Sequence, residues 1–394
     1  MDSSLADSPI AVDLFCGAGG LSDGLEQAGF RPVLGIDFDR HALATYKANH
    51  PNSRAMLRDI AEVNSADLIE AAEGRDIDLI AGGPSCQGFS TVGKRIEDDP
   101  RNALFMHFAR LVRDVRPKFF LMENVKGLLT YRKGYFRQLI KESFEYSGYR
   151  VVSKVVCAAD YGVPQLRYRI VFIGTRLDIE PTIPEATHFE PNLFGGKPYV
   201  TVGEALGDLP LLHGQFDQDE WEYASPPVTA YQQYARNNTQ ANTVTLHRAN
   251  GMSQGARKVV ELVSEGQGVR SISPELLPER FTRMRTISDG SLRKDCTTLY
   301  HRLARWAPAY TITCSFRNVA SGPFVHPTEN RSISYREAAR LMSFRDNYQF
   351  LSPGLTRQIG NAVPPLLGKA LGIHIRKMMI LEGETAFRNM LIAA

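Results

Sequence analysis

The chain has 394 residues, of which 43% are hydrophobic and 23% charged, a composition that suits a globular protein with a large core and a second, smaller lobe. No apolar run reaches the roughly 18 residues of a membrane span, and residues 1–9 are polar rather than signal-like. Five cysteines without a C-x-x-C pair favour reduced thiols, no structural zinc or other metal site, and a cytoplasmic location.

The net charge of +3 is unevenly distributed along the chain. Residues 231–310 hold 12 Lys and Arg against 6 Asp and Glu, so a local excess of +6 stands beside a remainder of −3. A charged run is often only a solvated face. A basic segment on a slightly acidic body is also typical of a protein that binds a polyanion.

The N-terminal pattern predicts the start of a doubly wound α/β domain. Residues 10–15 form an apolar strand pattern, 16–20 a glycine turn and 21–28 a helical pattern that ends at Gly29. The glycines depart from G-x-G-x-x-G, which counts against a nicotinamide or flavin cofactor.

The ends of the next two strands favour a nucleoside ligand without phosphates. Asp37 lies 20 residues beyond Gly17, where an acid can bind both ribose hydroxyls, and Phe38 can cover an adenine ring. Asp59 and Ile60 follow the third strand and can contact the adenine amino group. These features indicate S-adenosylmethionine. Asp37 can also cap the helix that follows it.

A cysteine loop follows the fourth predicted strand. The strand covers residues 76–81, and the loop G-G-P-S-C-Q-G-F-S places Cys86 among glycines and a proline. The first and fourth strands of a doubly wound sheet are neighbours, so the Gly17 turn and this loop should face one crevice. Glu123 ends the fifth strand and should lie beside Cys86 as a candidate acid. A buried structural cysteine is the simpler alternative.

Later segments of the chain contain further candidate polar side chains and a predicted lid. Residues 87–101 are glycine-rich and charged, as in a mobile lid. Gln165, Arg167 and Arg169 alternate along an extended segment and should share one face. Residues 199–305 lack regular periodicity and contain the basic excess.

The C-terminal part returns to helical patterns. Residues 334–344 predict a helix, with Ser334 and Glu337 as a capping box. Residues 358–365 then lead into a closing helix over 366–381.

The order of these motifs resembles the DNA cytosine-5 methyltransferases of bacterial type. The motifs are D-L-F-C-G-A-G-G (13–20), G-G-P-S-C-Q (82–87), E-N-V (123–125), Q-L-R-Y-R (165–169), R-E-A-A-R-L (336–341) and Q-I-G-N-A-V-P-P (358–365). The resemblance covers nearly the whole chain apart from about 185–300. Leu166, Met342 and Arg345 depart from common family residues, and none stands at an expected chemical position.

The resemblance implies a mostly parallel, Rossmann-like methyltransferase sheet with a smaller, irregular DNA-recognition lobe. Residues 1–184 would form the catalytic domain, with 306–394 packed back onto it, and 185–305 the target-recognition lobe. The expected partner is double-stranded DNA, with a restriction endonuclease acting separately and the enzyme itself a monomer.

The resemblance also implies residue roles. Cys86 would add to C6 of a flipped-out cytosine, Glu123 would bind N3 and the exocyclic amine, and Arg167 would hold O2, while Gln165 and Arg169 organise the loop. S-adenosylmethionine, released as S-adenosylhomocysteine, would contact Phe15, Gly17, Ala18, Gly19, Gly20, Leu21, Asp37, Phe38, Asp59, Ile60, Gly82, Pro84, Asn361 and Ala362.

Three alternatives remain at the level of sequence. One branch of this family methylates tRNA, and basic residues bind either nucleic-acid backbone. A non-catalytic nucleic-acid binder on the same scaffold is a second alternative, although intact Cys86, Glu123, Arg167 and Asp37 speak against it. A nicotinamide dehydrogenase is the third and fits the glycine spacing poorly.

Overall fold

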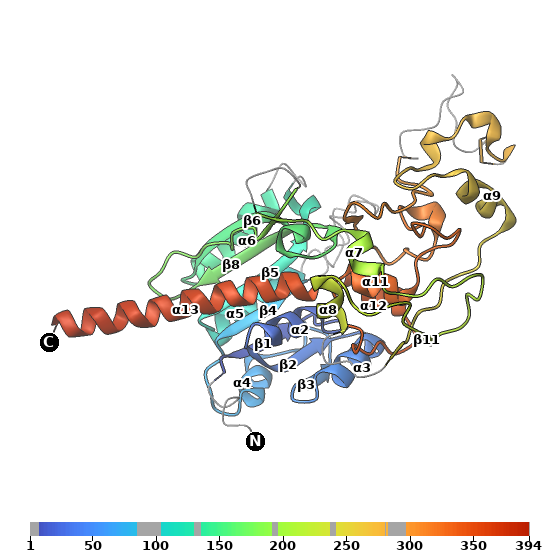
Figure 1. Cartoon of the computed structure of the whole chain (residues 1–394). Coiled ribbons are helices and arrows are strands. Elements are labelled where there is room, and N and C mark those ends of the chain that lie inside the picture. Colours follow the sequence, from blue (N-terminus) through green and yellow to red (C-terminus); the bar gives the residue numbers. More distant parts are fainter. Residues whose placement is uncertain are drawn as a thin grey trace.

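A computed structural model describes residues 8–84, 104–129, 135–190, 196–236, 242–279, 281–282 and 297–393, with side chains as far as residue 383. Its centre is a seven-stranded sheet in the order β3-β2-β1-β4-β5-β8-β6 (Figure 1). Strand β8 alone runs in the direction opposite to the other six strands. The strands are β1 (Ile10–Leu14), β2 (Arg31–Asp37), β3 (Arg54–Leu57), β4 (Leu79–Gly82), β5 (Phe119–Val125), β6 (Arg150–Cys157) and β8 (Tyr168–Thr175).

Helices cover both faces of this sheet, and the side chains alternate between them as a pleated strand requires. On β5, Phe120 and Met122 join one apolar cluster, whereas Phe119 and Leu121 join another. The first cluster is closed by α4 (Ser65–Ala71), α5 (Leu104–Val115) and α6 (Tyr135–Tyr146), and the second by α2 (Gly20–Gln27) and α13 (Pro365–Ala393). The helix α3 (Arg40–Asn49) packs on β2 and β3. The predicted doubly wound α/β class is therefore confirmed.

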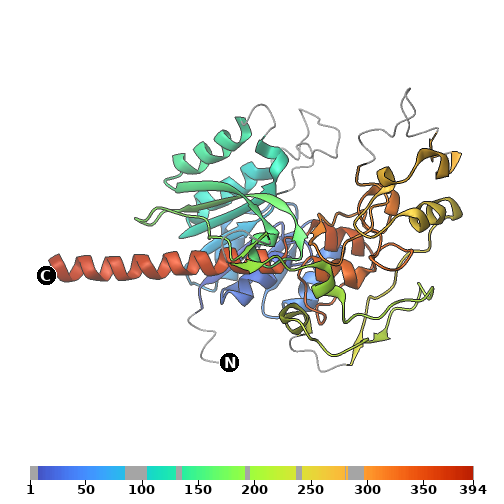
Figure 2. The same cartoon turned by 45° about the horizontal axis from the view of Figure 1, so that its top comes forward.

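The C-terminal helix α13 packs against the N-terminal part of the chain. It packs along α2, with Leu367, Leu371 and Ile375 fully buried. Both views show its last turns extending beyond the sheet (Figures 1 and 2). The prediction ended this helix at residue 381, whereas it continues to Ala393.

A second group of elements lies on the opposite side of the sheet from the end of α13 (Figure 2). It has its own apolar cluster, which includes Val259, Val269, Leu299 and Val325. Of the helices, α9 (Gln254–Leu262) contributes to this cluster, whereas α7 (Val202–Leu206), α8 (Ala230–Arg236), α11 (Tyr335–Leu341) and α12 (Leu355–Asn361) pack in another apolar cluster, which also includes Ala18 and Phe344. The short strands outside the main sheet are β7 (Gln165–Leu166), β9 (His188–Phe189), β10 (Lys197–Pro198), β11 (Trp221–Glu222), β12 (Thr243–Val244) and β13 (Ala309–Tyr310).

Local predictions agree with the structure where a motif is self-contained. The predicted Ser334–Glu337 capping box is present. Two details were wrong. Asp39 rather than Asp37 caps α3, because its side chain accepts hydrogen bonds from the backbone N–H groups of His41 and Ala42. Residues 358–361 belong to helix α12 rather than to a loop.

Candidate active site

The carboxyl ends of β1, β4 and β5 bring three predicted segments to one edge of the sheet. Strand β1 pairs with β4 so that Leu14 lies opposite Gly82, and β4 pairs with β5 so that Gly82 lies opposite Met122. The turn after β1, the chain leaving β4 and Glu123 therefore share one edge, which is where open α/β sheets bind their ligands.

The chain that leaves β4 is fixed beside Glu123. The side-chain amide of Asn124 donates to the Pro84 carbonyl at 3.0 Å. Gly83 lies close to Glu123, since a Cβ built there would be only 3.3 Å from Glu123 Oε2. Cys86 and the predicted lid over residues 87–101 lie outside the described residues.

Glu123 forms an ion pair with Arg169 at this edge. Arg169 Nε lies 2.7 Å from Glu123 Oε1, and the two side chains retain 13% and 11% of their exposure. They come from neighbouring antiparallel strands, in which Glu123 lies opposite Val171. A carboxylate and a guanidinium are thus available together, nearly enclosed but still reachable from solvent.

Arg167 does not occupy the position predicted for it. Its side chain is buried, and its guanidinium donates to the backbone carbonyls of Ile312 (3.0 Å), Gly360 (3.1 Å) and Ala362 (3.0 Å). The structure therefore does not bring Arg167 to the position expected for a contact with the O2 of a cytosine, because its terminal nitrogens already join distant backbone segments. The arginine beside Glu123 is Arg169.

Gln165 shares this structural role. Its amide nitrogen donates to the Leu341 carbonyl at 2.9 Å, and its amide oxygen accepts from the Ile312 N–H at 2.9 Å. Burial, reinforced by the nearby Arg169 guanidinium, also lowers the pKa of Arg167, and the Glu123 carboxylate opposes this shift. Gln165 and Arg167 consequently hold residues 312 and 360–362 against the strand that carries Arg169.

The turn after β1 is held open by a carboxylate. Asp37 Oδ2 accepts from the Gly17 N–H at 2.8 Å, and Asp37 Oδ1 accepts from the Asp39 N–H at 2.8 Å. Burial raises the pKa of Asp37, and these backbone bonds oppose that shift. Phe15 adopts a left-handed φ of 64°, which is strained for a bulky residue and typical of functional turns.

The surroundings of this turn suit a nucleoside ligand. A Cβ at Gly17 would meet no atom within 4 Å. Phe38 is 77% exposed at the end of β2, a free aromatic face next to Asp37. Asp59 is exposed and Ile60 buried after β3. Beneath the turn, Asp13 Oδ1 is a buried acceptor without a recorded partner among the described residues.

The C-terminal segment closes the turn from the other side. A Cβ at Gly20 would lie 2.4 Å from the Val363 carbonyl oxygen and 3.2 Å from the Ala362 Cβ, so only glycine allows this approach. Asn361 ends α12 and is exposed, whereas Ala18 and Leu21 are buried in the turn and helix. The segment predicted to complete the pocket thus lies against Gly20.

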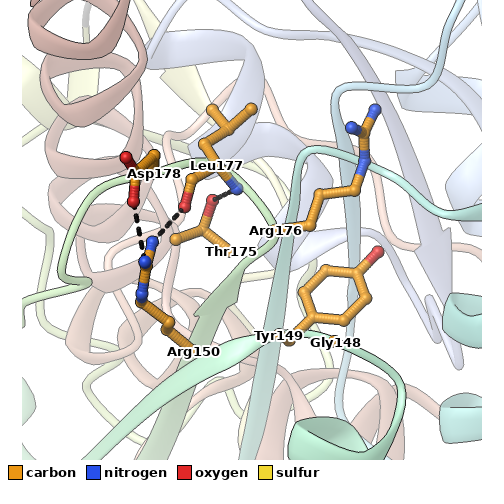
Figure 3. Close-up of a pocket in the computed structure, with 7 residues that line it drawn as sticks. All are labelled: Gly148, Tyr149, Arg150, Thr175, Arg176, Leu177 and Asp178. Carbon is orange, nitrogen blue, oxygen red and sulfur yellow. Dashed lines mark hydrogen bonds and ion pairs between the residues drawn. The ribbon is translucent and has the colours of Figure 1, made fainter.

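A hollow at the opposite edge of the sheet is separate from this site. It is lined by residues 148–150 and 175–178, and in it Arg150 donates to the Leu177 carbonyl and to Asp178 (Figure 3). Thr175 pairs with Phe119, the first residue of β5, so the hollow lies at the strand ends away from Glu123.

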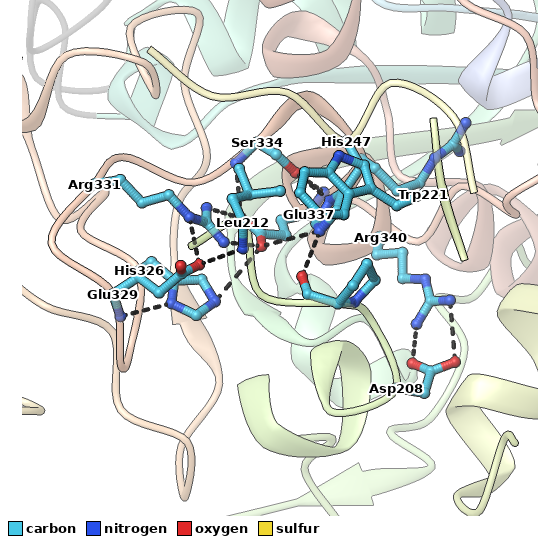
Figure 4. A network of polar contacts seen from close by, with 12 residues as sticks. Asp208, Leu212, Trp221, His247, His326, Glu329, Arg331, Ser334, Glu337 and Arg340 are labelled. Atoms are coloured by element: carbon cyan, nitrogen blue, oxygen red, sulfur yellow. Dashed lines mark hydrogen bonds and ion pairs between the residues drawn. The ribbon is translucent and has the colours of Figure 1, made fainter. Parts of the chain in front are cut away.

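Sequence reasoning missed a network of buried charges around α11 (Figure 4). Arg331 donates to both oxygens of Glu337 at 2.8 and 2.7 Å, and Arg340 binds Asp208 and Asp346. All of the α11 side chains are buried, including its two arginines. The only sequence signal was the density of charged residues in R-E-A-A-R-L, which looks like a solvated helix face.

Comparison with known proteins identifies the family. Residues 11–377 match C-5 cytosine-specific DNA methylase. The chain belongs to this family. Two similar relatives are the type II methyltransferase M1.HphI of Haemophilus parahaemolyticus, 38% identical over 93% of this chain and 86% of the relative, and M.DdeI of Desulfomicrobium norvegicum, 35% identical over 92% and 88%.

A solved Escherichia coli protein described as a prophage-encoded DNA modification methyltransferase has a similar fold, with a TM-score of 0.73, 27% identity and coverage of 94% of this chain and 99% of that protein. The chain is thus a DNA cytosine-5 methyltransferase of the type II kind, and the dehydrogenase and binding-only alternatives are set aside. Among the described residues, no helix is long and apolar enough to span a membrane.

Proposed function

We propose that this methyltransferase modifies C5 of a cytosine flipped out of duplex DNA, through covalent addition of the Cys86 thiolate to C6. The observation that carries the proposal is the Glu123–Arg169 pair at the carboxyl end of β5. It lies beside the segment Gly83–Pro84, which leads within two residues to Cys86. A thiolate must approach above the plane of the base, so the cytosine has to leave the helical stack.

The pair supplies what the addition step requires. Cytosine C5 is a weak nucleophile, and attack of the thiolate at C6 moves electron density onto C5 and the polar edge of the ring. Glu123 binds the N3 and exocyclic amine edge, and Arg169 balances the charge that develops at O2. After methylation, the C5 proton is taken by a base and Cys86 leaves by β-elimination, which restores the aromatic ring.

The residues around the first turn fit S-adenosylmethionine. Asp37 would bind the ribose hydroxyls, Phe38 would cover the adenine, and the Gly17–Leu21 turn with Asn361 and Ala362 would enclose the methionine part. Asp59, Ile60, Gly82 and Pro84 would complete the wall. When bound, S-adenosylmethionine supplies the methyl group and leaves as S-adenosylhomocysteine.

We assign DNA recognition to residues 185–305, beside a catalytic domain made of 1–184 and 306–394. The basic excess of residues 231–310 supports this assignment, since phosphate contacts dominate DNA affinity. The relatives named as type II methyltransferases support a pairing with a restriction endonuclease that acts separately on the same sequence. The enzyme then acts as a monomer in the cytoplasm.

Trapping on duplex DNA that contains 5-fluorocytosine tests the mechanism. Fluorine at C5 cannot leave as a proton does, so the enzyme should remain attached to the DNA after denaturation when S-adenosylmethionine is present. Cys86→Ser should form no adduct. An adduct formed by the serine variant would refute the assigned nucleophile, and an adduct on substituted tRNA but not on DNA would refute the substrate.

A further inference from the structure

A buried polar chain reaches the first turn from below. The Tyr348 hydroxyl donates to the Ala18 carbonyl, and His50 Nε2 lies 3.2 Å from the same hydroxyl. His50 Nδ1 lies 2.9 Å from Glu26 Oε1. Tyr348 and His50 are 4% and 1% exposed, so water does not offer these groups alternative partners.

The direction of the hydrogen bonds follows from the chemistry of the groups. A carbonyl oxygen only accepts, so the single hydroxyl proton of Tyr348 is committed to Ala18. The hydroxyl oxygen is then left to accept from His50 Nε2, while Glu26 Oε1, which also only accepts, faces His50 Nδ1. The imidazole makes both contacts by donating from both ring nitrogens, and these two bonds fix its orientation between Glu26 and Tyr348.

The turn packs so closely on His50 and Tyr348 that it has no space for a side chain at Gly19. Gly19 has a left-handed φ of 93°, and a Cβ there would lie 2.4 Å from His50 Nε2 and 2.7 Å from the Tyr348 hydroxyl oxygen. The backbone thus rests directly on the two polar atoms. Asp37 holds the Gly17 N–H on one side of the turn, and Tyr348 holds the Ala18 carbonyl on the other.

The loop that carries Tyr348 is itself fixed to α3. Asn49 and Gln349 exchange two hydrogen bonds, at 2.8 and 2.9 Å, and Thr45 Oγ1 accepts from the Leu351 N–H at 2.8 Å. The Tyr348 ring also packs between Phe344 and Phe350, with centroids 4.7 and 5.2 Å away. The hydroxyl is therefore preorganised by contacts that do not depend on the bond to Ala18.

We propose that Tyr348, oriented by His50, is a positioning residue that holds the Ala18–Gly19 backbone in the conformation that binds S-adenosylmethionine. The inference rests on the cofactor assignment made above. It names a role for two side chains beneath the turn, which act through the backbone of the turn rather than by contact with the ligand. Preorganisation of this kind lowers the free-energy cost of ordering a loop when a ligand binds.

Tyr348→Phe tests the proposal because it removes only the hydroxyl. Tyr149→Phe is the matched control, since Tyr149 is also buried and its hydroxyl donates at 2.7 Å to the Pro117 carbonyl at the opposite edge of the sheet. Binding of S-adenosylhomocysteine is measured by calorimetry, and hydrogen exchange of the amides in residues 17–21 is measured without ligand.

We expect Tyr348→Phe to weaken S-adenosylhomocysteine binding about tenfold, the equivalent of one hydrogen bond, and to speed exchange in the free turn. The loss should appear in the KM for S-adenosylmethionine rather than in kcat. Tyr149→Phe should lower the melting temperature similarly and leave binding and exchange at the turn unchanged. Equal binding by Tyr348→Phe and wild type would overturn the proposal, whereas a wild type that binds no S-adenosylhomocysteine would overturn the cofactor assignment instead.

Replacements of His50 test the second link. His50→Gln can still donate to the Tyr348 hydroxyl and should bind S-adenosylhomocysteine within about threefold of wild type, because one amide N–H replaces the ring N–H. His50→Phe offers no donor and should match Tyr348→Phe. If the glutamine variant loses as much affinity as the phenylalanine variant, His50 does not orient Tyr348.

Discussion

Carboxylates meet arginines in two regions of this enzyme, with different surroundings. Around α11, Arg340 is fully buried, binds Asp208 and Asp346, and also donates to the Ala205 carbonyl. At the sheet edge, Arg169 forms an ion pair with Glu123, and both side chains keep some exposure to solvent. In the first region, the charged groups are bound to other groups of the protein. In the Glu123–Arg169 pair, the partly exposed oxygens and nitrogens can still bond to a base.

The difference in burial suggests different roles for the two regions, one structural and one in binding the substrate. A buried ion pair costs desolvation and is stable only when every charge is satisfied, so it fixes one geometry. A pair that keeps some exposure, such as Glu123–Arg169, can exchange partners when a ligand arrives. Substitutions in the α11 network should therefore affect mainly stability, and substitutions in the Glu123–Arg169 pair mainly activity.

The largest effect is expected at α11. Arg340→Met leaves buried Asp346 without its ion-pair partner and Asp208 with Arg236 alone, so the free energy of unfolding should fall by about 3–5 kcal/mol. Urea titration followed by circular dichroism measures the loss. A fall below about 1 kcal/mol would contradict the view that this network fixes α11.

The two arginines of Q-L-R-Y-R should fail in opposite ways. Arg169→Ala should lower kcat about 100- to 1000-fold with little loss of stability, as expected for a donor that offsets developing charge. Arg167→Met should instead lower the free energy of unfolding by about 1–3 kcal/mol, because three buried carbonyls lose their donor. Steady-state methylation and urea unfolding of both variants provide the comparison, and a reversed pattern would restore the original assignment of Arg167.

The α11 network should also make the protein sensitive to acid. Burial, reinforced by nearby Arg331, lowers the pKa of His326 to about 3. The Arg331 guanidinium holds the pKa of Glu337 below its usual range despite burial. In both cases the unfolded chain binds the proton more readily, so the stability is complete above about pH 6.5 and is lost as the pH falls.

Between pH 7 and pH 5, His326 alone should account for a loss of about 2 kcal/mol in the free energy of unfolding. His326→Gln should flatten this part of the profile. A wild-type profile that is level over the same range would show that the histidine charges without cost, and the buried network would then not be rigid.

The smallest effect is expected for an exposed pair. Arg54 and Glu70 lie 3.3 Å apart with 49% and 70% of their side chains exposed. Arg54→Ala should change the free energy of unfolding by less than about 0.5 kcal/mol, since water replaces the contact. A larger loss would mean that exposure is a poor guide to the role of a charged pair in this fold.

Local pattern predicted the elements well and their long-range partners poorly. The strands and most helices follow from apolar periodicity and caps, which depend on neighbours within a few residues. Arg167 was assigned to the base from the family resemblance of its motif, but its guanidinium binds carbonyls of residues 312, 360 and 362. No local pattern in the sequence places those carbonyls there.

The same limit applies to Tyr348 and His50, which are 298 residues apart in the chain and contact each other beneath the turn. The sequence placed Glu123 and the Gly17 turn at one edge because strand order follows from the α/β pattern. It could not show which buried polar side chains would support that edge. Residues 185–305, to which we assign DNA recognition, were distinguished in the sequence only by basic charge, irregular periodicity and the family resemblance.

The approach of Val363 to Gly20 has a consequence for synthesis on the ribosome. Every strand of the sheet lies before residue 176, yet the wall of the first turn is made of residues translated almost 190 positions later. The proposed methyl-donor site therefore lacks one wall until residue 363 has been synthesised, although every strand of the sheet is already present.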